Sequence, residues 1–271
     1  MHELFIIAER CAPLWGTIGP NMTPESAASL EPAPAGMGEF SRIMGVFFEP
    51  KKAFDDIAKR PGWLVPMALV ILSAIAVTVV IGQHIGWERV FRHQMETNAR
   101  MQQLSPEQRE QTLAMQVKFA SIGGVVGAIV VVPVYCLIVA AVLLGIVAGI
   151  LSAPIKFKQA LAAVCYGGLP ALVSSLLVIV VMFLKNPDDF NIANPLAFNV
   201  GAFLDPQASS KFVYSVATSI DLFAFWMILL VATGLKAAGG KKLSFGGALF
   251  AVLLPWAVVV LIKASFAGMF S

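Results

Sequence analysis

Five apolar segments, each long enough to cross a lipid bilayer, limit what this chain can fold into. They run over about 63–85, 122–151, 160–184, 212–235 and 245–270. A spanning helix needs ~20 consecutive apolar residues, and each segment reaches that length. Inside a membrane the backbone has to satisfy its own hydrogen bonds, which a single segment achieves as a helix. The sequence therefore predicts an all-α, polytopic membrane protein with five transmembrane helices.

The composition agrees with a membrane protein. Hydrophobic residues make up 58% of the chain and charged residues 13%, whereas soluble domains are nearer half apolar and a quarter charged. The net charge is +3 and the chain has no long basic tract, so we expect no nucleic-acid partner. The three cysteines are scattered and suggest neither a disulfide framework nor a metal site.

Sequence motifs for catalysis or cofactor binding are missing. The chain contains no HExxH, GxSxG, Walker or GxGxxG motif. His84 and His93 flank the end of the first segment, but a metal site needs more ligands nearby, so we interpret them as ordinary interfacial residues. We expect no enzymatic activity, no metal and no cofactor.

The N-terminal 40 residues differ from the rest of the chain. A signal peptide needs a basic start and an apolar stretch of roughly 7–15 residues, but this chain offers Glu3 and a short apolar patch at 4–8. Residues 19–40 are rich in Pro, Ala, Ser and Glu without periodicity. We predict a disordered tail over 1–40 and a five-helix membrane domain over 41–271. Translation can start at Met1, Met22 or Met37.

The second segment is too long for one perpendicular span. Its 30 residues would extend about 45 Å at ~1.5 Å per residue, against a hydrocarbon core of ~30 Å. Pro133 removes one helical hydrogen bond and is the predicted kink. Before this segment, Ser105 suits an N-cap, Pro106 suits the first helical position and Gln108 completes a capping box. We expect one long helix that begins outside the membrane.

The basic residues predict the orientation. If the five spans alternate, ten Lys and Arg residues fall on one side and seven on the other. The positive-inside rule places the richer side in the cytoplasm, so the N-terminus is expected there and the C-terminus outside. The ten residues are Arg42, Lys51, Lys52, Lys59, Arg60, Lys156, Lys158, Lys236, Lys241 and Lys242.

Asp221 stands inside the fourth segment and Lys263 inside the fifth. A short connection makes these two helices antiparallel neighbours, and the charges lie ~13 and ~10 Å from the same end at ~1.5 Å per residue. A charge at such depth costs at least ~2.5–3.5 kcal/mol, so we predict an intramembrane charge pair, Asp221 with Lys263. A structural pair that fixes helix packing is favoured. The alternatives are a proton or ion relay, and Lys263 reaching the interface alone.

Small residues four apart on a membrane helix let a second helix approach closely. Gly82/Gly86, Gly123/Gly127 and Gly145/Gly149 have this spacing, and Trp226 stands near the middle of the fourth segment. Packing within the chain is favoured, with a homo-oligomer face as the alternative. The predicted helix-packing residues are Gly123, Gly127, Pro133, Gly145, Gly149 and Trp226.

Aromatic and basic residues alternate just before the first span. They predict a short interfacial helix whose aromatic rings contact the headgroup boundary and whose lysines meet anionic lipid. The alternative is a simple basic flank of the first span. The predicted lipid or interface residues are Phe47, Phe48, Lys51, Lys52, Phe54, Lys59 and Arg60.

Several stretches resemble the bacterial branch of the Yip-domain family, named for Ypt/Rab-interacting membrane proteins. They are "RIMGVFFEPKKAFDDIAKRPGWLVP", "LSPEQREQTLAM", "FKQALAAVCYGGLPALV", "NIANPLAFNVGAFLD" and "IDLFAFWMILLVATGLKAAGGKKLSFGGALFAVLLPW". The last is the closest match, with Asp221, Phe223, Trp226 and Gly234 in the expected order. The resemblance covers about 41–270 and implies a five-span helical domain with a cytoplasmic N-terminus.

Eukaryotic relatives in that family act in vesicle traffic and bind small GTPases. This chain lacks the Asp-Leu-Tyr-Gly-Pro stretch that those members carry, so a GTPase partner is not transferred to it. The leading hypothesis is a non-enzymatic scaffold or adaptor of a bacterial cytoplasmic membrane, which acts through helix packing, lipid contact or an unidentified membrane protein partner. The alternative is a small-solute or ion transporter with Asp221 on its pathway.

Overall fold

A computed structural model describes residues 36–97, 99–187, 190, 192, 194–205 and 208–269. The unit Met37–Ser271 is compact in itself. Most of the predicted disordered tail, residues 1–35, lies outside the described residues. The first helix among the described residues, α1 (Glu39–Phe48), begins two residues before the predicted start of the membrane domain.

Five helical stretches are long and apolar enough to cross a membrane, so the predicted fold class is confirmed. They are Leu64–Ile85, Pro106–Ile150, Phe157–Leu184, Leu222–Lys242 and Phe245–Met269. The helices within them are α3 (Leu64–Val80), α6 (Pro106–Leu144), α7 (Phe157–Gly167), α8 (Pro170–Leu184), α10 (Leu222–Gly239) and α11 (Phe245–Met269). Shorter helices are α2 (Pro50–Lys59), α4 (Trp87–Thr97), α5 (Ala99–Gln102) and α9 (Lys211–Ser219).

The long helix α6 begins as the sequence predicts. The Ser105 hydroxyl accepts a 3.2 Å hydrogen bond from the Gln108 amide, and the Gln108 side chain accepts a 3.0 Å bond from the Ser105 amide. Two of the free N–H groups at the helix start are therefore satisfied by a capping box. The helix continues through Pro133, and the bend predicted there stays a prediction.

The fourth apolar segment is not one continuous helix over 212–235, so that prediction is wrong. Helix α9 ends at Ser219 and α10 begins at Leu222, with Asp221 in an extended conformation. The break is held by the loop around Asn199, because Val200 N donates to Ile220 O at 3.1 Å and Leu222 N donates to Phe198 O at 3.0 Å. Backbone groups that leave the helix thus find partners, as an apolar environment requires.

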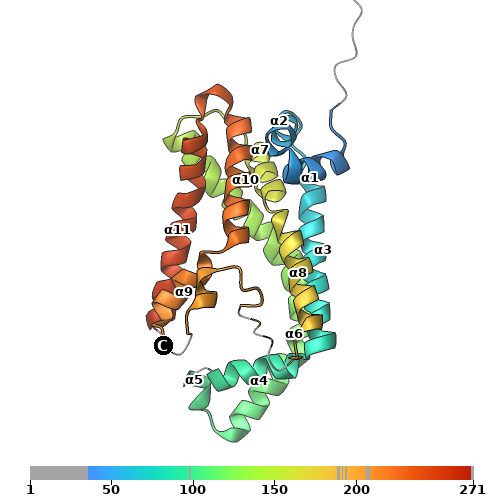
Figure 1. The fold of residues 1–271 in the computed structure, drawn as a ribbon, viewed down its shortest axis with the longest axis vertical. Coiled ribbons are helices and arrows are strands. Elements are labelled where there is room, and N and C mark those ends of the chain that lie inside the picture. The colour runs from blue at the N-terminus through green and yellow to red at the C-terminus, as the bar shows by residue number, and fades with distance from the viewer. Residues whose placement is uncertain are drawn as a thin grey trace, which may run out of the picture. The chain divides into compact units, whose positions relative to one another are not determined.

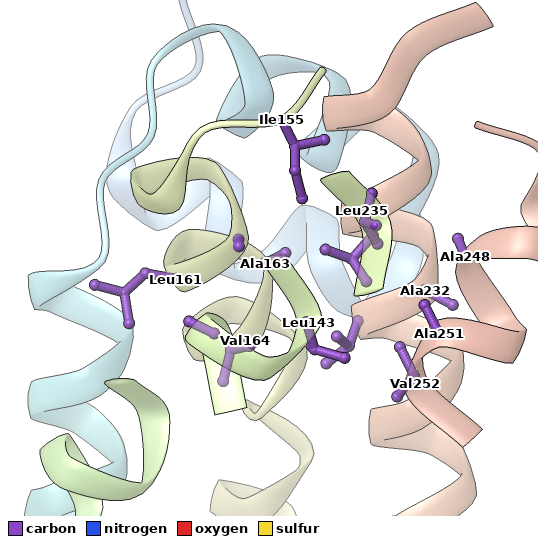
Figure 2. Close-up of a cluster of buried hydrophobic side chains, with 14 of the residues drawn as sticks. Leu143, Ile155, Leu161, Ala163, Val164, Ala232, Leu235, Ala248, Ala251 and Val252 are labelled. Atoms are coloured by element: carbon purple, nitrogen blue, oxygen red, sulfur yellow. The ribbon is translucent and has the colours of Figure 1, made fainter. Parts of the chain in front are cut away.

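The largest core cluster lies where α6, α7, α10 and α11 meet (Figure 2). Small residues bring α7 and α10 into close contact: a Cβ added to Gly234 would lie 2.7 Å from the Ala163 Cβ. Alanines fill the contact between α10 and α11, with Ala232, Ala248 and Ala251 fully buried. Small residues at these positions let the helix backbones approach, and dispersion contacts between them stabilise the bundle.

The connections gather at two opposite ends of the bundle (Figure 1). Helices α1 and α2, the start of α7 and the α10–α11 connection lie at one end, which we call the N-terminal end. Helices α4 and α5 lie at the other end. The ten basic residues counted above belong to elements of the N-terminal end. The structure agrees with the predicted partition of charge, and the membrane side that each end faces stays a prediction.

Candidate functional site

Helices α1 and α2 form a hairpin, here called the N-terminal cap, that packs on the bundle. Pro50 occupies the first position of α2, where its missing N–H costs no hydrogen bond. Close approach of the two helices needs a glycine, since a Cβ on Gly45 would lie 3.0 Å from the Ala53 Cβ. Phe54 and Ile57 are buried and form one cluster with Tyr166 of α7. The cap is therefore part of the folded core.

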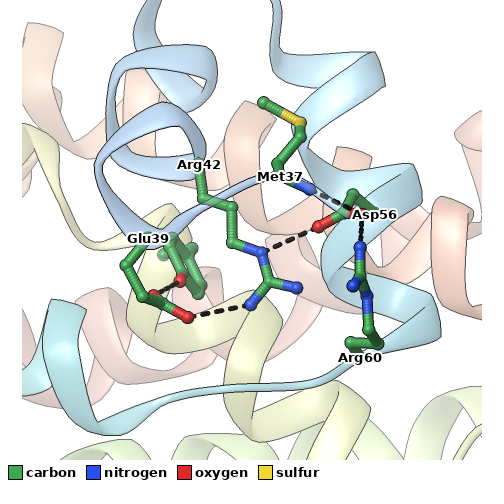
Figure 3. Close-up of polar contacts among 6 residues, drawn as sticks. Met37, Glu39, Arg42, Asp56 and Arg60 are labelled. Atoms are coloured by element: carbon green, nitrogen blue, oxygen red, sulfur yellow. Dashed lines mark hydrogen bonds and ion pairs between the residues drawn. The ribbon is translucent and has the colours of Figure 1, made fainter. Parts of the chain in front are cut away.

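A polar network fastens the cap to α7 (Figure 3). Arg42 is at its centre: its Nη1 donates to Glu39 Oε1 at 2.9 Å and its Nε donates to Asp56 Oδ2 at 2.8 Å. The Tyr166 hydroxyl donates to Glu39 Oε2 at 2.5 Å. Arg60 Nη2 donates to Asp56 Oδ1 at 2.6 Å. We call Glu39, Arg42, Asp56, Arg60 and Tyr166 the Arg42 network.

Hydrogen bonding decides the charge state of this network. Burial alone would raise the pKa of Asp56, but hydrogen bonds from Arg60, from Arg42 and from the Met37 amide outweigh it and leave that pKa below its ordinary value. Burial alone would lower the pKa of Arg42, yet its bond to Asp56 raises it. Both groups are therefore charged at neutral pH, and a charge buried as deeply as Arg42 requires such partners.

The structure divides the predicted lipid and interface residues into two groups. Phe54 is buried against the bundle, and the half-buried Phe47 ring meets the Trp226 ring edge-on at 5.7 Å between centroids. Headgroup contact by Phe54 is therefore excluded, because the α2 face that carries it is the face docked on α7 and α10. The remaining predicted residues are exposed: Phe48, Lys51, Lys52, Lys59 and Arg60.

Asp221 is the N-cap of α10. Its Oδ1 accepts hydrogen bonds from the amides of Phe223 at 2.8 Å and Ala224 at 3.1 Å. A carboxylate at this position satisfies free N–H groups and faces the positive end of the helix dipole. This explains an acid inside an apolar run: the helix is interrupted there and the acid starts the next one.

Lys263 has a partner other than Asp221. Its Nζ lies 3.4 Å from the Ser219 hydroxyl, two residues before Asp221. Among the residues that the structure describes, Asp221 and Lys263 form no ion pair. The two side chains reach the same break between α9 and α10, but Asp221 bonds to the helix start and Lys263 is exposed.

The predicted GxxxG packing residues do not contact a second helix. A Cβ added to Gly123, Gly127, Gly145 or Gly149 would meet nothing within 4 Å in the described part of the chain. The intramolecular packing role is therefore wrong for these four positions of the second span, two on α6 and two in the π-helical turn Gly145–Ile150 that follows it. Close helix contacts use other glycines, and Gly124, one position from the predicted pair, would place a Cβ 2.6 Å from Thr78. Trp226 does pack, against Phe47 and Phe223.

Two cavities lie near the end opposite the cap. One of about 250 Å³ is lined by residues that include Arg89, Arg92 and Glu96, and one of about 340 Å³ lies between α3 and α8 beside Ser174 and Ser175. Neither is lined by Asp221 or Lys263. Within the described residues, no three His, Cys, Asp or Glu side chains are grouped as a metal site would need.

Sequence reasoning missed the Arg42 network. The available signal was local: Glu39 and Arg42 are three apart, a spacing that pairs charges on a helix. The contribution of Tyr166, which is 127 positions from Glu39, has no sequence signature, because only the docking of α1 on α7 brings the two together.

The comparisons with known proteins give one result. A family model described as the Yip1 domain matches residues 44–266, which include α2, the first four spans and the fifth span as far as Phe266. No curated protein and no solved structure matches the chain.

Proposed function

The chain belongs to the Yip1 domain family, and from this premise we propose that it is a non-enzymatic scaffold or adaptor of a bacterial cytoplasmic membrane. It is a multi-pass membrane protein with five spans. In the proposal, the N-terminal end faces the cytoplasm, and the cap offers the surface on which lipid and a membrane protein partner are held.

One observation carries this proposal: the buried Arg42, Tyr166 and Asn199 form hydrogen bonds that hold parts of the fold together. Arg42 connects α1 to α2, and Tyr166 connects α7 to α1. The buried Asn199 donates to Asn194 Oδ1 at 2.7 Å within the loop whose backbone bridges to Asp221 at the helix break. Groups that are fully hydrogen-bonded within the fold make it rigid and specific. A rigid cap that exposes basic side chains fits a binding surface.

Partner recovery tests the scaffold proposal. The full chain is extracted in mild detergent, and the proteins retained with it are compared for the wild type, for Lys51→Glu with Lys52→Glu, and for a matched control, Lys118→Glu, at the opposite end. We expect one or more membrane proteins to be retained by the wild type and the control and lost from the cap variant. Equal retention by all three chains would contradict a partner surface on the cap.

Transport is the second candidate, and the interrupted fourth segment favours it. Discontinuous membrane helices with a helix N-terminus at the break are a feature of many transporters, and α10 begins at such a break beside Asp221. A flux assay with the full chain in liposomes tests this function. Selective solute movement that Asp221→Asn abolishes would support transport and overturn the scaffold proposal.

Self-association through the second span is the proposed alternative for the glycines that contact no second helix. Gly123 of α6, and Gly145 and Gly149 of the π-helical turn after it, are exposed. Cross-linking in the membrane with Gly145→Cys tests it, against Val126→Cys, which is also exposed but lies about 100° away around the helix at 3.6 residues per turn. We expect a specific dimer band at position 145 and little at position 126. Equal cross-linking at both positions would indicate random collision.

A further inference from the structure

Helix α1 carries an apolar stripe that the fold leaves uncovered. Phe40, Met44 and Phe48 are spaced four residues apart and are 75%, 40% and 76% exposed. This spacing places them on one face of the helix. The opposite face holds the buried Arg42 and Val46, so α1 is apolar on a side that the bundle does not cover.

The Arg42 network prevents this stripe from turning inward. Bonds from Arg42 to Asp56 and from Tyr166 to Glu39 fix the rotation of α1 about its axis. Val46 is completely buried. Covering Phe40 and Phe48 with the bundle would require α1 to rotate and so to break these contacts, which means that the described residues leave the stripe open to an outside partner.

The position of α1 identifies what covers it. Helix α1 lies level with the start of α3, the first transmembrane span (Figure 1). The first residues of that span, Leu64 and Val65, are themselves exposed and apolar, as expected where a span meets lipid. The stripe therefore lies at the depth where the hydrocarbon core of the bilayer begins.

Charges on the cap agree with this placement. Lys51 and Lys52 are exposed on α2, directly after the turn that follows Phe48. An amphipathic helix in the interface combines an apolar face at the acyl boundary with nearby lysines that meet anionic headgroups. The same combination occurs here across the two helices of the cap.

We propose that α1 is an interfacial wedge, whose Phe40, Met44 and Phe48 insert into the lipid leaflet at the N-terminal end of the bundle. The inference rests on the lipid contact in the proposed function and names its residues. It assigns the lipid contact to the uncovered face of α1 and no longer to Phe54 of α2, which is buried. Phospholipid of that leaflet is the partner.

Fluorescence quenching in lipid tests the wedge. The full chain carrying Cys11→Ser, Cys136→Ala and Cys165→Ala receives one cysteine, Met44→Cys on the stripe or Asp55→Cys on the exposed face of α2. Each is labelled with an environment-sensitive dye and placed in phosphatidylcholine–phosphatidylglycerol nanodiscs. We expect spin-labelled phospholipid to quench position 44 several-fold more than position 55, and aqueous iodide to show the reverse.

Two results would overturn the inference. Iodide quenching at position 44 equal to that at position 55 would place the stripe in water. Shielding of position 44 from both quenchers, growing with the number of chains per disc, would show a second copy on the stripe. As a further check, Phe40→Gln with Phe48→Gln should increase iodide access to position 44 several-fold, with unchanged thermal unfolding. Either quenching result would overturn the wedge alone, because the proposed function is tested separately by partner recovery and by the flux assay.

Discussion

The Tyr166 hydroxyl donates a 2.5 Å hydrogen bond to Glu39 Oε2, and so joins the third span to α1. Tyr166 is completely buried, while the Glu39 side chain is 45% exposed. Glu39 also receives a bond from Arg42. A single carboxylate therefore links the core of the bundle to the ion pairs within the cap.

Removing this hydroxyl should loosen the cap. Tyr166→Phe leaves Glu39 with Arg42 alone and should lower the free energy of unfolding by about 1–2 kcal/mol, in the range for a hydrogen bond to a partly exposed charged group. Thermal unfolding in detergent and hydrogen exchange of α1 measure the loss. Tyr135→Phe, on the exposed face of α6, is the matched control and should have little effect. Equal losses for the two variants would contradict a role for the Glu39 bond.

Arg42 should be the most sensitive position of the network. Arg42→Met leaves the carboxylate of Asp56, which is 15% exposed, without its buried partner, and breaking a buried pair costs about 3–5 kcal/mol. Arg60→Gln removes the other cation, which is 54% exposed, and should cost at most about 1 kcal/mol because water screens exposed pairs. Thermal unfolding of both variants in the same detergent gives the ranking. A larger loss for Arg60→Gln would show that the buried pair is not the main contact.

Acid should weaken the same contact. Hydrogen bonds hold the pKa of Asp56 below its ordinary value of 3.8 in the folded chain. A group with a lowered folded pKa contributes stability that is complete above its unfolded pKa and is lost as the pH falls through the folded pKa. The difference in unfolding temperature between the wild type and Asp56→Asn should therefore be constant near neutral pH and shrink below 3.8. A constant difference down to the lowest pH at which the chain folds would disprove the linkage.

Asp221 and Lys263 should act independently. Asp221→Ala removes the cap of α10 and should cost about 1 kcal/mol, whereas Asp221→Ser keeps a capping oxygen and should cost less. Because the structure gives the two residues different partners, the losses from Asp221→Ala and Lys263→Met should add in the double variant. A double-mutant cycle with thermal unfolding measures this. Strong coupling between the two substitutions would instead support the Asp221–Lys263 charge pair that the sequence predicts.

Two glycines should respond oppositely to alanine. A Cβ on Gly234 would lie 2.7 Å from the Ala163 Cβ and 2.9 Å from the Phe54 ring, so Gly234→Ala should separate α10 from α7 and the cap and cost about 1–3 kcal/mol. Gly123→Ala meets nothing within 4 Å and should be neutral or slightly stabilising, since alanine favours the helix. Unfolding temperatures of the two variants decide the point. A neutral Gly234→Ala would contradict the close contact between these helices.

Much of the fold could be predicted because local chemistry encodes it. Each span is a run of apolar residues whose length matches a bilayer, and Ser105 to Gln108 carry a helix start within four residues. The break in the fourth segment was missed because no glycine or proline marks it. Asp221 follows "SVATSI", a sequence that does not by itself end a helix. The Arg42 network was missed for a related reason. Residue spacing predicts which face of a helix is apolar, but it does not predict which other helix packs on that face.

By itself, the sequence determined the number of spans, the position of α6 and the separation of basic residues between the ends of the bundle. These properties depend on neighbouring residues and on the thickness of a bilayer. The tertiary structure decided the role of each polar residue. Asp221 is a helix cap because the fourth segment is interrupted there. Phe54 is part of the core, and Tyr166 contacts Glu39, because helices distant in the chain pack together. The energy of a buried polar group depends on the atoms around it, and only the folded chain specifies those atoms.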